Sequence, residues 1–186
     1  MTADQAVEAI IDALEAVGIP YMIVGSLASN FHGIPRSTRD ADFVAELPPG
    51  SLQRLADVLP RDLHVPLQGS FEAVTGTTRY LVELVDSPFV CELSVRSDDP
   101  HDQERFRRRQ RVRLLGRSAV VATAEDTIVT KLRWASEANR VKDREDIRNI
   151  LTVRGPDLDL AYVDRWSTEH GTTHLLEQIR ATVPPV

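Results

Sequence analysis

The sequence predicts an α+β fold in which an α/β half is followed by a helical half. Up to about residue 122, short apolar runs of strand length alternate with segments of helical apolar spacing. From Thr123 onward, apolar residues recur only at helical spacing. We therefore expect a core over residues 1–122 and a C-terminal helical region over residues 123–186 that packs on it.

Composition limits the class of protein. The 186 residues suffice for one domain, or for one domain with a small appendage. The net charge of −6, from 22 basic and 28 acidic residues, excludes a uniformly basic nucleic-acid coat but not a local basic site. Cys91 is the single cysteine, which excludes an internal disulfide and is typical of a reducing compartment. The sequence shows no membrane-length apolar stretch and no signal peptide, so we expect a cytoplasmic protein without a membrane partner.

The elements of the first half follow from apolar spacing and from turn residues. Thr2 or Asp4 can cap the first helix, Gly18 can end it, and Ser51 can cap the third helix. We predict helices over 6–17, 27–32 and 51–59, strands over 20–24 and 41–45, a hairpin of strands over 78–85 and 89–95, and a strand over 112–122 that is interrupted at Gly116.

The helical half begins at a capping motif. Thr123 is followed three residues later by Asp126, which resembles a capping box with Asp in place of Glu. A second helix is predicted over 142–153, and two more surround Trp166 and residues 175–176. Trp134 and Trp166 are interpreted as helix-packing residues.

Two short motifs could carry chemistry. Gly25 has no Cβ, so the backbone there can approach a ligand closely, and Ser26 can cap the next helix, whose N-terminus favours phosphate. Asp40 and Asp42 would lie on the same face of a strand, where they repel each other unless a cation or a proton lies between them. The alternatives are an ordinary strand-to-helix turn and two solvated acids, or an acid paired with a nearby arginine.

In combination, these motifs resemble the nucleotidyltransferase superfamily. The order strand, Gly25-Ser26, helix, basic loop and Asp40-Ala41-Asp42 carries the resemblance over about twenty residues, and a looser likeness reaches Ile150. The spacing is similar to that of toxin-type bacterial nucleotidyltransferases of the abortive-infection class (AbiEii-like). The resemblance implies a mixed β-sheet with flanking helices and a third carboxylate on a neighbouring strand.

Glu92 is the position that matches this third carboxylate. A charged residue inside an apolar strand is costly to bury unless it is paired or bound to metal, which independently favours Glu92. Glu83 is the competing position, and either side chain could instead lie on a solvent-facing side of the sheet. The family usually has Asp here, so the longer Glu leaves turnover open.

The resemblance implies Mg²⁺ or Mn²⁺ as cofactor. Two such ions would clamp the attacking and leaving oxygens at the α-phosphorus of a nucleoside triphosphate (NTP). The implied catalytic residues and metal ligands are Asp40, Asp42 and Glu92. The implied nucleotide-binding residues are Gly25, Ser26, Arg36, Thr38, Arg39 and Lys131, with Asp143 or Asp146 as a further candidate.

Some of these residues also have simpler interpretations. Lys131 could lie on a solvated helix face, because lysine is usually exposed. Asp143 and Asp146 are three residues apart and could form local helix salt bridges with Lys142 or Arg144.

A run of arginines occupies alternate positions. In a strand these side chains would form one basic face that could hold an RNA or another phosphate-bearing acceptor. The acidic segment over 98–104 could instead neutralise it. The run consists of Arg105, Arg107, Arg109, Arg111 and Arg113.

The leading hypothesis is a nucleotidyltransferase that moves a nucleoside monophosphate from an NTP to a hydroxyl of RNA, protein or a small molecule. By resemblance, it could be the toxin of a toxin–antitoxin pair. The alternative is a catalytically inactive nucleotidyltransferase-like module that binds a nucleotide or a partner. An interaction protein with an accidental motif is the third interpretation.

Overall fold

The computed structural model describes residues 1–72, 76–138 and 140–184. The strands are β1 Tyr21–Val24, β2 Asp40–Ala45, β3 Leu63–His64, β4 Ser70–Glu72, β5 Thr77–Leu84, β6 Val90–Val95, β7 Gln110–Leu114 and β8 Arg117–Val121. The helices are α1 Ala3–Ala16, α2 Gly25–His32, α3 Ser51–Val58, α4 Pro100–Arg108, α5 Ala124–Ala138, α6 Val141–Arg154, α7 Leu160–Glu169 and α8 Thr173–Arg180.

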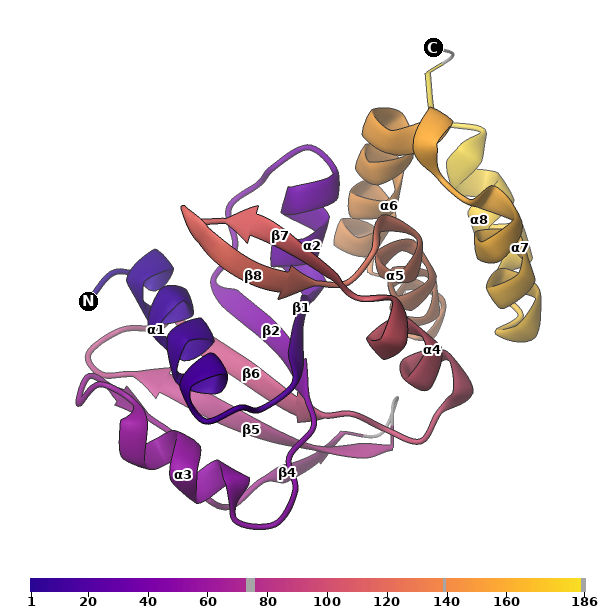
Figure 1. Cartoon of the computed structure of the whole chain (residues 1–186). Helices are drawn as coiled ribbons and strands as arrows, with labels where there is room; N and C mark the ends of the chain where they lie inside the picture. Colours follow the sequence, from indigo (N-terminus) through magenta and orange to yellow (C-terminus); the bar gives the residue numbers. More distant parts are fainter. Residues whose placement is uncertain (73–75, 139, 185–186) are drawn as a thin grey trace.

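The strands of the described residues form one eight-stranded mixed sheet. Its order is β3-β5-β6-β2-β1-β8-β7, and β4 also pairs with β5. The pairs β2–β6 and β1–β8 are parallel, whereas the other pairs are antiparallel. Figure 1 shows α1 and α3 against the sheet, and α5 to α8 grouped together beside α2 and α4. The predicted mixed sheet with flanking helices and a helical C-terminal part is confirmed.

The apolar residues form two buried clusters. One extends in sequence from Ala6 to Ala122 and includes the apolar face of α1 and the inner residues of the sheet. The other extends from Ala124 to Ile179 and lies between the C-terminal helices. Helix α2 contacts both α5 and α6, so it joins the sheet to the helical part. No helix in the described ranges is both long enough and apolar enough to cross a membrane.

Several local predictions are confirmed. Thr2 caps α1 in a reciprocal capping box with Gln5. Gly18 follows the end of α1 at φ +67°, the left-handed conformation that suits glycine after a helix. The segments 78–85 and 89–95 form the β5–β6 hairpin, and the interruption at Gly116 is the turn of the β7–β8 hairpin.

The alternate arginines do not form one basic strand face, and Arg105 pairs with Asp102 of the acidic segment, in agreement with the alternative interpretation. Asp99 accepts hydrogen bonds from the N–H groups of His101 and Asp102, and Pro100 occupies the first turn, so a helix begins here. Arg105 and Arg107 are therefore helical, Arg109 ends the helix, and only Arg111 and Arg113 share strand β7. Asp99 and Pro100 were a readable signal for this helix.

Two predicted helix caps are also wrong. Val24, in extended conformation, is the residue before α2, and Ser26 lies inside its first turn. Gly50 is the residue before α3, and the Ser51 hydroxyl donates to the carbonyl oxygen of Pro48 at 2.7 Å. Val24 and Gly50 thus occupy the cap positions, and the side chains of Ser26 and Ser51 form other hydrogen bonds.

Candidate active site

Three carboxylates meet on one face of the sheet. Strands β2 and β6 run parallel with Asp42 directly opposite Glu92, and Asp40 precedes Asp42 by two residues. Side chains two apart on a strand, and side chains directly opposite on neighbouring strands, point to the same face. All three line one pocket of about 320 Å³. Glu83, the competing position, is exposed on β5, and the pocket lining of the described residues does not include it.

The carboxylates repel one another. Burial, followed by the charges of Asp40 and Glu92, raises the pKa of Asp42 to about 7. The charge of Lys131 and the backbone hydrogen bond from Ser26 act in the opposite direction but do not cancel it. Three carboxylates on one face, with Asp42 between two other acids and resisting ionisation, fit a hard divalent cation, which would stabilise the charged form of Asp42.

Gly25 allows the chain to pass this close to Asp42. Its φ of +60° is a left-handed conformation that glycine adopts without strain. A Cβ at this position would lie 2.7 Å from Asp42 Cγ and closer still to Oδ2. Glycine is thus required here by both conformation and space, and the resulting approach puts the first turn of α2 beside the carboxylates.

A buried chain of ion pairs lies next to the carboxylates. Lys131 Nζ on α5 contacts Asp143 Oδ1 and Asp146 Oδ2 of α6, both at 2.8 Å. Arg36 donates from Nε and Nη2 to the two oxygens of Asp146, each at 2.7 Å, and from Nη2 to Ser26 Oγ at 3.1 Å. Lys131 is 6% exposed and Asp146 is 2% exposed. The interpretation of Lys131 as a residue on a solvated helix face is therefore wrong. Asp143 and Asp146 form ion pairs with Lys131 of the other helix, α5, and do not pair only within α6.

The remaining predicted site residues have different positions. Thr38 Oγ1 donates to Asp40 Oδ1 at 2.5 Å and so orients that carboxylate. Gly25, Ser26, Lys131 and Asp143 line the pocket with the three acids. Arg39 is exposed, and the described lining of the pocket includes neither Arg39 nor Arg36, so Arg36 reaches the site through Ser26.

The sequence reasoning missed several residues of the pocket. Arg79 Nη1 on β5 donates to Glu92 Oε2 at 2.9 Å, with both side chains about a third exposed. The hairpin register signals this contact, because Leu81 is opposite Glu92 and Arg79 is its diagonal neighbour. Trp134 was interpreted as a packing residue, yet it lines the pocket and is only half-buried. The other cationic residues of the lining are Arg105, Arg140 and Lys142.

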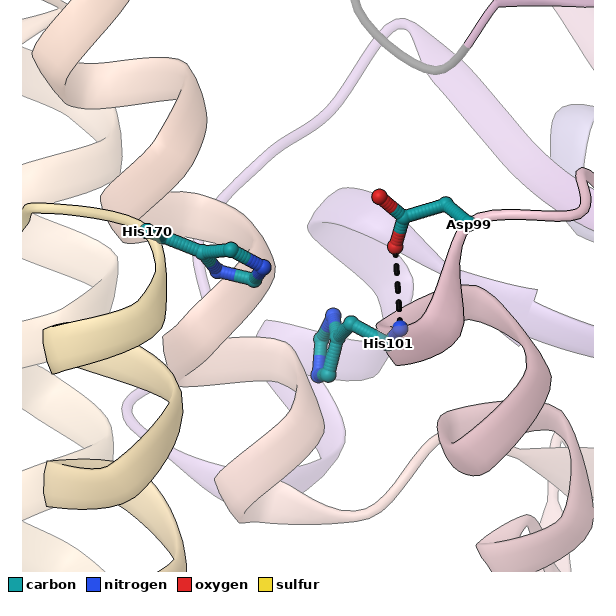
Figure 2. Close-up of side chains that lie close together, drawn as sticks. All are labelled: Asp99, His101 and His170. Carbon is teal, nitrogen blue, oxygen red and sulfur yellow. Dashed lines mark hydrogen bonds between the residues drawn. The ribbon is translucent and has the colours of Figure 1, made fainter.

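A second polar cluster consists of residues that are not part of the described lining. Figure 2 shows Asp99, His101 and His170 close together, with one ligand-type atom of each within 4.8 Å of the others. Arg133 Nη1 already donates to Asp99 Oδ1 at 3.3 Å. Burial, and then the charge of Arg133, lowers the pKa of His170 to about 4. The Arg133 guanidinium therefore already occupies the Asp99 oxygen that a metal ion would need as a ligand. We interpret the cluster as a contact between the start of α4 and the end of α7.

Solved structures were compared once this geometry was established. The solution structure of the antibiotic-resistance factor ANT(2'')-Ia matches with a TM-score of 0.64 and 15% identity over 94% of this chain and 96% of that chain. An antigenic nucleotidyltransferase-like protein from Paracoccidioides brasiliensis matches with a TM-score of 0.58 and 16% identity over 98% and 94%. The lincomycin-bound lincosamide adenylyltransferase LnuA matches with a TM-score of 0.54 and 11% identity over 80% and 96%.

No protein-family model and no curated protein sequence matches the chain. The likeness is therefore one of backbone architecture. It agrees with the resemblance carried by Gly25-Ser26 and Asp40-Ala41-Asp42, which the structure brings together at one pocket. The chain has the nucleotidyltransferase fold.

Proposed function

We propose that this protein is a nucleotidyltransferase that uses Mg²⁺ or Mn²⁺ to move a nucleoside monophosphate from an NTP to a hydroxyl acceptor. The observation that carries the proposal is the register of β2 and β6, which sets Asp42 beside Glu92 with Asp40 on the same face. The raised pKa of Asp42 supports it, because such a set of acids is stabilised by a divalent cation. The nucleotidyltransferase fold is the second support.

The residues of the chain divide the work of the reaction. Asp40, Asp42 and Glu92 would hold the metal, which supplies charge stabilisation to the attacking and leaving oxygens when it is bound. Glu92 would accept the proton of the acceptor hydroxyl. The hydroxyl oxygen then bonds to the α-phosphorus while pyrophosphate departs. Gly25 and Ser26 would put the positive end of the α2 dipole beside the phosphate chain, with the Ser26 hydroxyl as a donor, since the Ser26 N–H is already bonded to Asp42.

The described lining holds as many acids as cations, and three of the cations are paired with acids of the lining, so its formal charge does not select the acceptor. RNA is the acceptor suggested by the resemblance to toxin-type enzymes, with an antitoxin as partner. The cations are Arg79, Arg105, Lys131, Arg140 and Lys142, and the acids are Asp40, Asp42, Glu92, Asp102 and Asp143.

A binding module without turnover is the second candidate. The ion pair between Arg79 and Glu92 favours it, since Glu92 Oε2 already has a cationic partner at 2.9 Å. A glutamate held in this way would bind a metal less readily than a free carboxylate would.

A labelling screen separates the two candidates. The protein is incubated with each labelled NTP, Mg²⁺ and cell extract, and label is sought on RNA, protein and small molecules, with tobramycin and lincomycin as separate acceptors. We expect transfer that EDTA abolishes and Mn²⁺ restores. Glu92→Gln should lose it, whereas Glu83→Gln, an exposed acid on β5 outside the pocket lining, should keep it. NTP binding without any labelled product would favour the binding module.

A further inference from the structure

Trp134 and its neighbours form a distinct end of the pocket. Thr127, Lys131 and Trp134 are four and three residues apart on α5, so they share one helix face, and all three line the pocket. Trp166, in contrast, is 9% exposed and belongs to the C-terminal apolar cluster. An indole that is half-buried in a pocket wall presents a flat apolar surface to a ligand.

Arg140 adds a second planar group at this place. Its guanidinium carbon lies 4.9 Å from the centre of the Trp134 ring, and its side chain is exposed at the start of α6. Arg140 also lines the pocket. Indole rings and guanidinium planes are the two kinds of protein surface on which nucleobases stack, and neither selects strongly among bases.

Trp134 lies further along α5 than Lys131, the residue of this helix whose charge acts on the carboxylates. Lys131, whose charge acts on Asp42, is one helical turn from Trp134, a rise of about 4.5 Å along α5. A ribose separates the α-phosphate of an NTP from its base, so a base must lie several ångströms beyond the metal-binding acids. The α5 face thus runs from the phosphate end of the pocket toward a stacking surface.

We infer that Trp134, assisted by Arg140, is the stacking surface for the base of the NTP. The inference rests on the proposed function, because it assumes that the pocket binds an NTP. Stacking uses the ring face that every base has, so it should strengthen the binding of all NTPs, with only a modest preference for purines, and should not contribute to the binding of inorganic tripolyphosphate.

Intrinsic fluorescence tests the inference with a matched pair of variants. Trp134 and Trp166 are the only two tryptophans in the chain. ATP should quench the fluorescence of Trp166→Phe, which retains Trp134, and should leave that of Trp134→Phe almost unchanged. By calorimetry, Trp134→Ala should weaken ATP binding about tenfold or more and leave tripolyphosphate binding unchanged. Circular dichroism checks that each variant is folded, and Trp134→Phe should retain most of the ATP affinity.

Three outcomes would overturn the inference. Equal ATP affinity of the Trp134→Ala variant and the native protein would show that Trp134 is not the stacking surface, and the proposed function would be unaffected. Equal weakening of ATP and tripolyphosphate would mean that Trp134 only supports the phosphate site. No binding of any NTP to the native protein would overturn both the inference and the proposed function.

Discussion

Two groups of carboxylates lie next to each other in opposite electrostatic states. Asp40, Asp42 and Glu92 share one sheet face, and the pKa of Asp42 is raised to about 7 by burial and by the other two acids. For Asp146, burial also favours the neutral form, but the hydrogen bonds from Arg36 and the charge of Lys131 outweigh it and lower the pKa. The difference teaches that burial alone does not identify a functional acid, whereas a lack of compensating cations does.

The division of labour follows from this contrast. The compensated aspartates hold α5, α6 and the loop before β2 in place, so they stabilise the walls of the pocket. Asp42, in contrast, is kept beside Asp40 and Glu92 although they repel it, which costs folding free energy and leaves a set of ligands ready for a cation.

The largest expected effect is that of Asp42→Asn. Transfer should fall below detection because a shared metal ligand is lost. In the absence of metal, the variant should be more stable than the native protein at pH 8, by on the order of 1 kcal/mol or more, because a repelled charge is removed. Chemical denaturation in EDTA measures the second effect. Lower stability of the variant at pH 8 would show that Asp42 is already compensated.

Asp146→Asn should have the opposite effect on stability. Removing one partner of a buried ion pair costs about 3–5 kcal/mol, and Asp146 is the centre of the Arg36 and Lys131 bonds. The exposed Asp164, which pairs with Arg180, is the control, and Asp164→Asn should cost only about 0–1 kcal/mol. Urea denaturation at pH 7 compares them, and equal costs would contradict the structural role of Asp146.

The difference in stability between the native protein and Asp146→Asn should depend on pH in a defined direction. The folded pKa of Asp146 lies below its ordinary value of 3.8, so its contribution is present above about pH 4 and is lost as the pH falls through the lower folded value. The stability gap between the native protein and Asp146→Asn should therefore shrink in acid and stay constant from pH 5 to 7.

Gly25→Ala should have an intermediate effect. Backbone strain and the contact with Asp42 together should cost about 1–3 kcal/mol and weaken Mn²⁺ binding. Gly171 has a similar φ of +67° and nothing within 4 Å of an added Cβ, so Gly171→Ala measures the strain alone. Calorimetry of unfolding and of Mn²⁺ binding gives both quantities. A Gly25→Ala variant with unchanged Mn²⁺ affinity would mean that Asp42 can move without loss.

Arg79→Gln should have the smallest effect. A partly exposed ion pair contributes about 0.2–1 kcal/mol, so freeing Glu92 should tighten Mn²⁺ binding by a factor of about 1.4 to 5. Arg165→Gln, which breaks a surface pair with Glu104, should leave Mn²⁺ binding unchanged. Weaker binding in Arg79→Gln would show that the arginine positions Glu92 for the metal.

Local patterns accounted for much of the fold and for the centre of the site. Strand alternation was enough to put Asp40 and Asp42 on one face, and an isolated charge in an apolar run indicated Glu92. The Asp99-Pro100 cap was also present but was overlooked, because alternate arginines in a strand offered a competing pattern. The error arose because the alternation of arginines was considered without the helix-start signal of Asp99 and Pro100.

The contacts between distant segments were beyond such patterns. Arg36 and Asp146 are 110 residues apart, and only the packing of α2 against α6 brings them together. Trp134 has the same helical spacing whether it faces a core or a pocket, so burial could not be decided from the sequence.

The sequence by itself determined the acids, the glycine turn beside them and most strands and helices, though not β3, β4 or α4, because these features depend on local backbone periodicity. The tertiary structure alone decided which acids are compensated, since Arg36 and Lys131 reach Asp146 from other elements while Asp42 receives two carboxylate neighbours. Electrostatic compensation depends on distances between segments, and those distances exist only after the chain has folded.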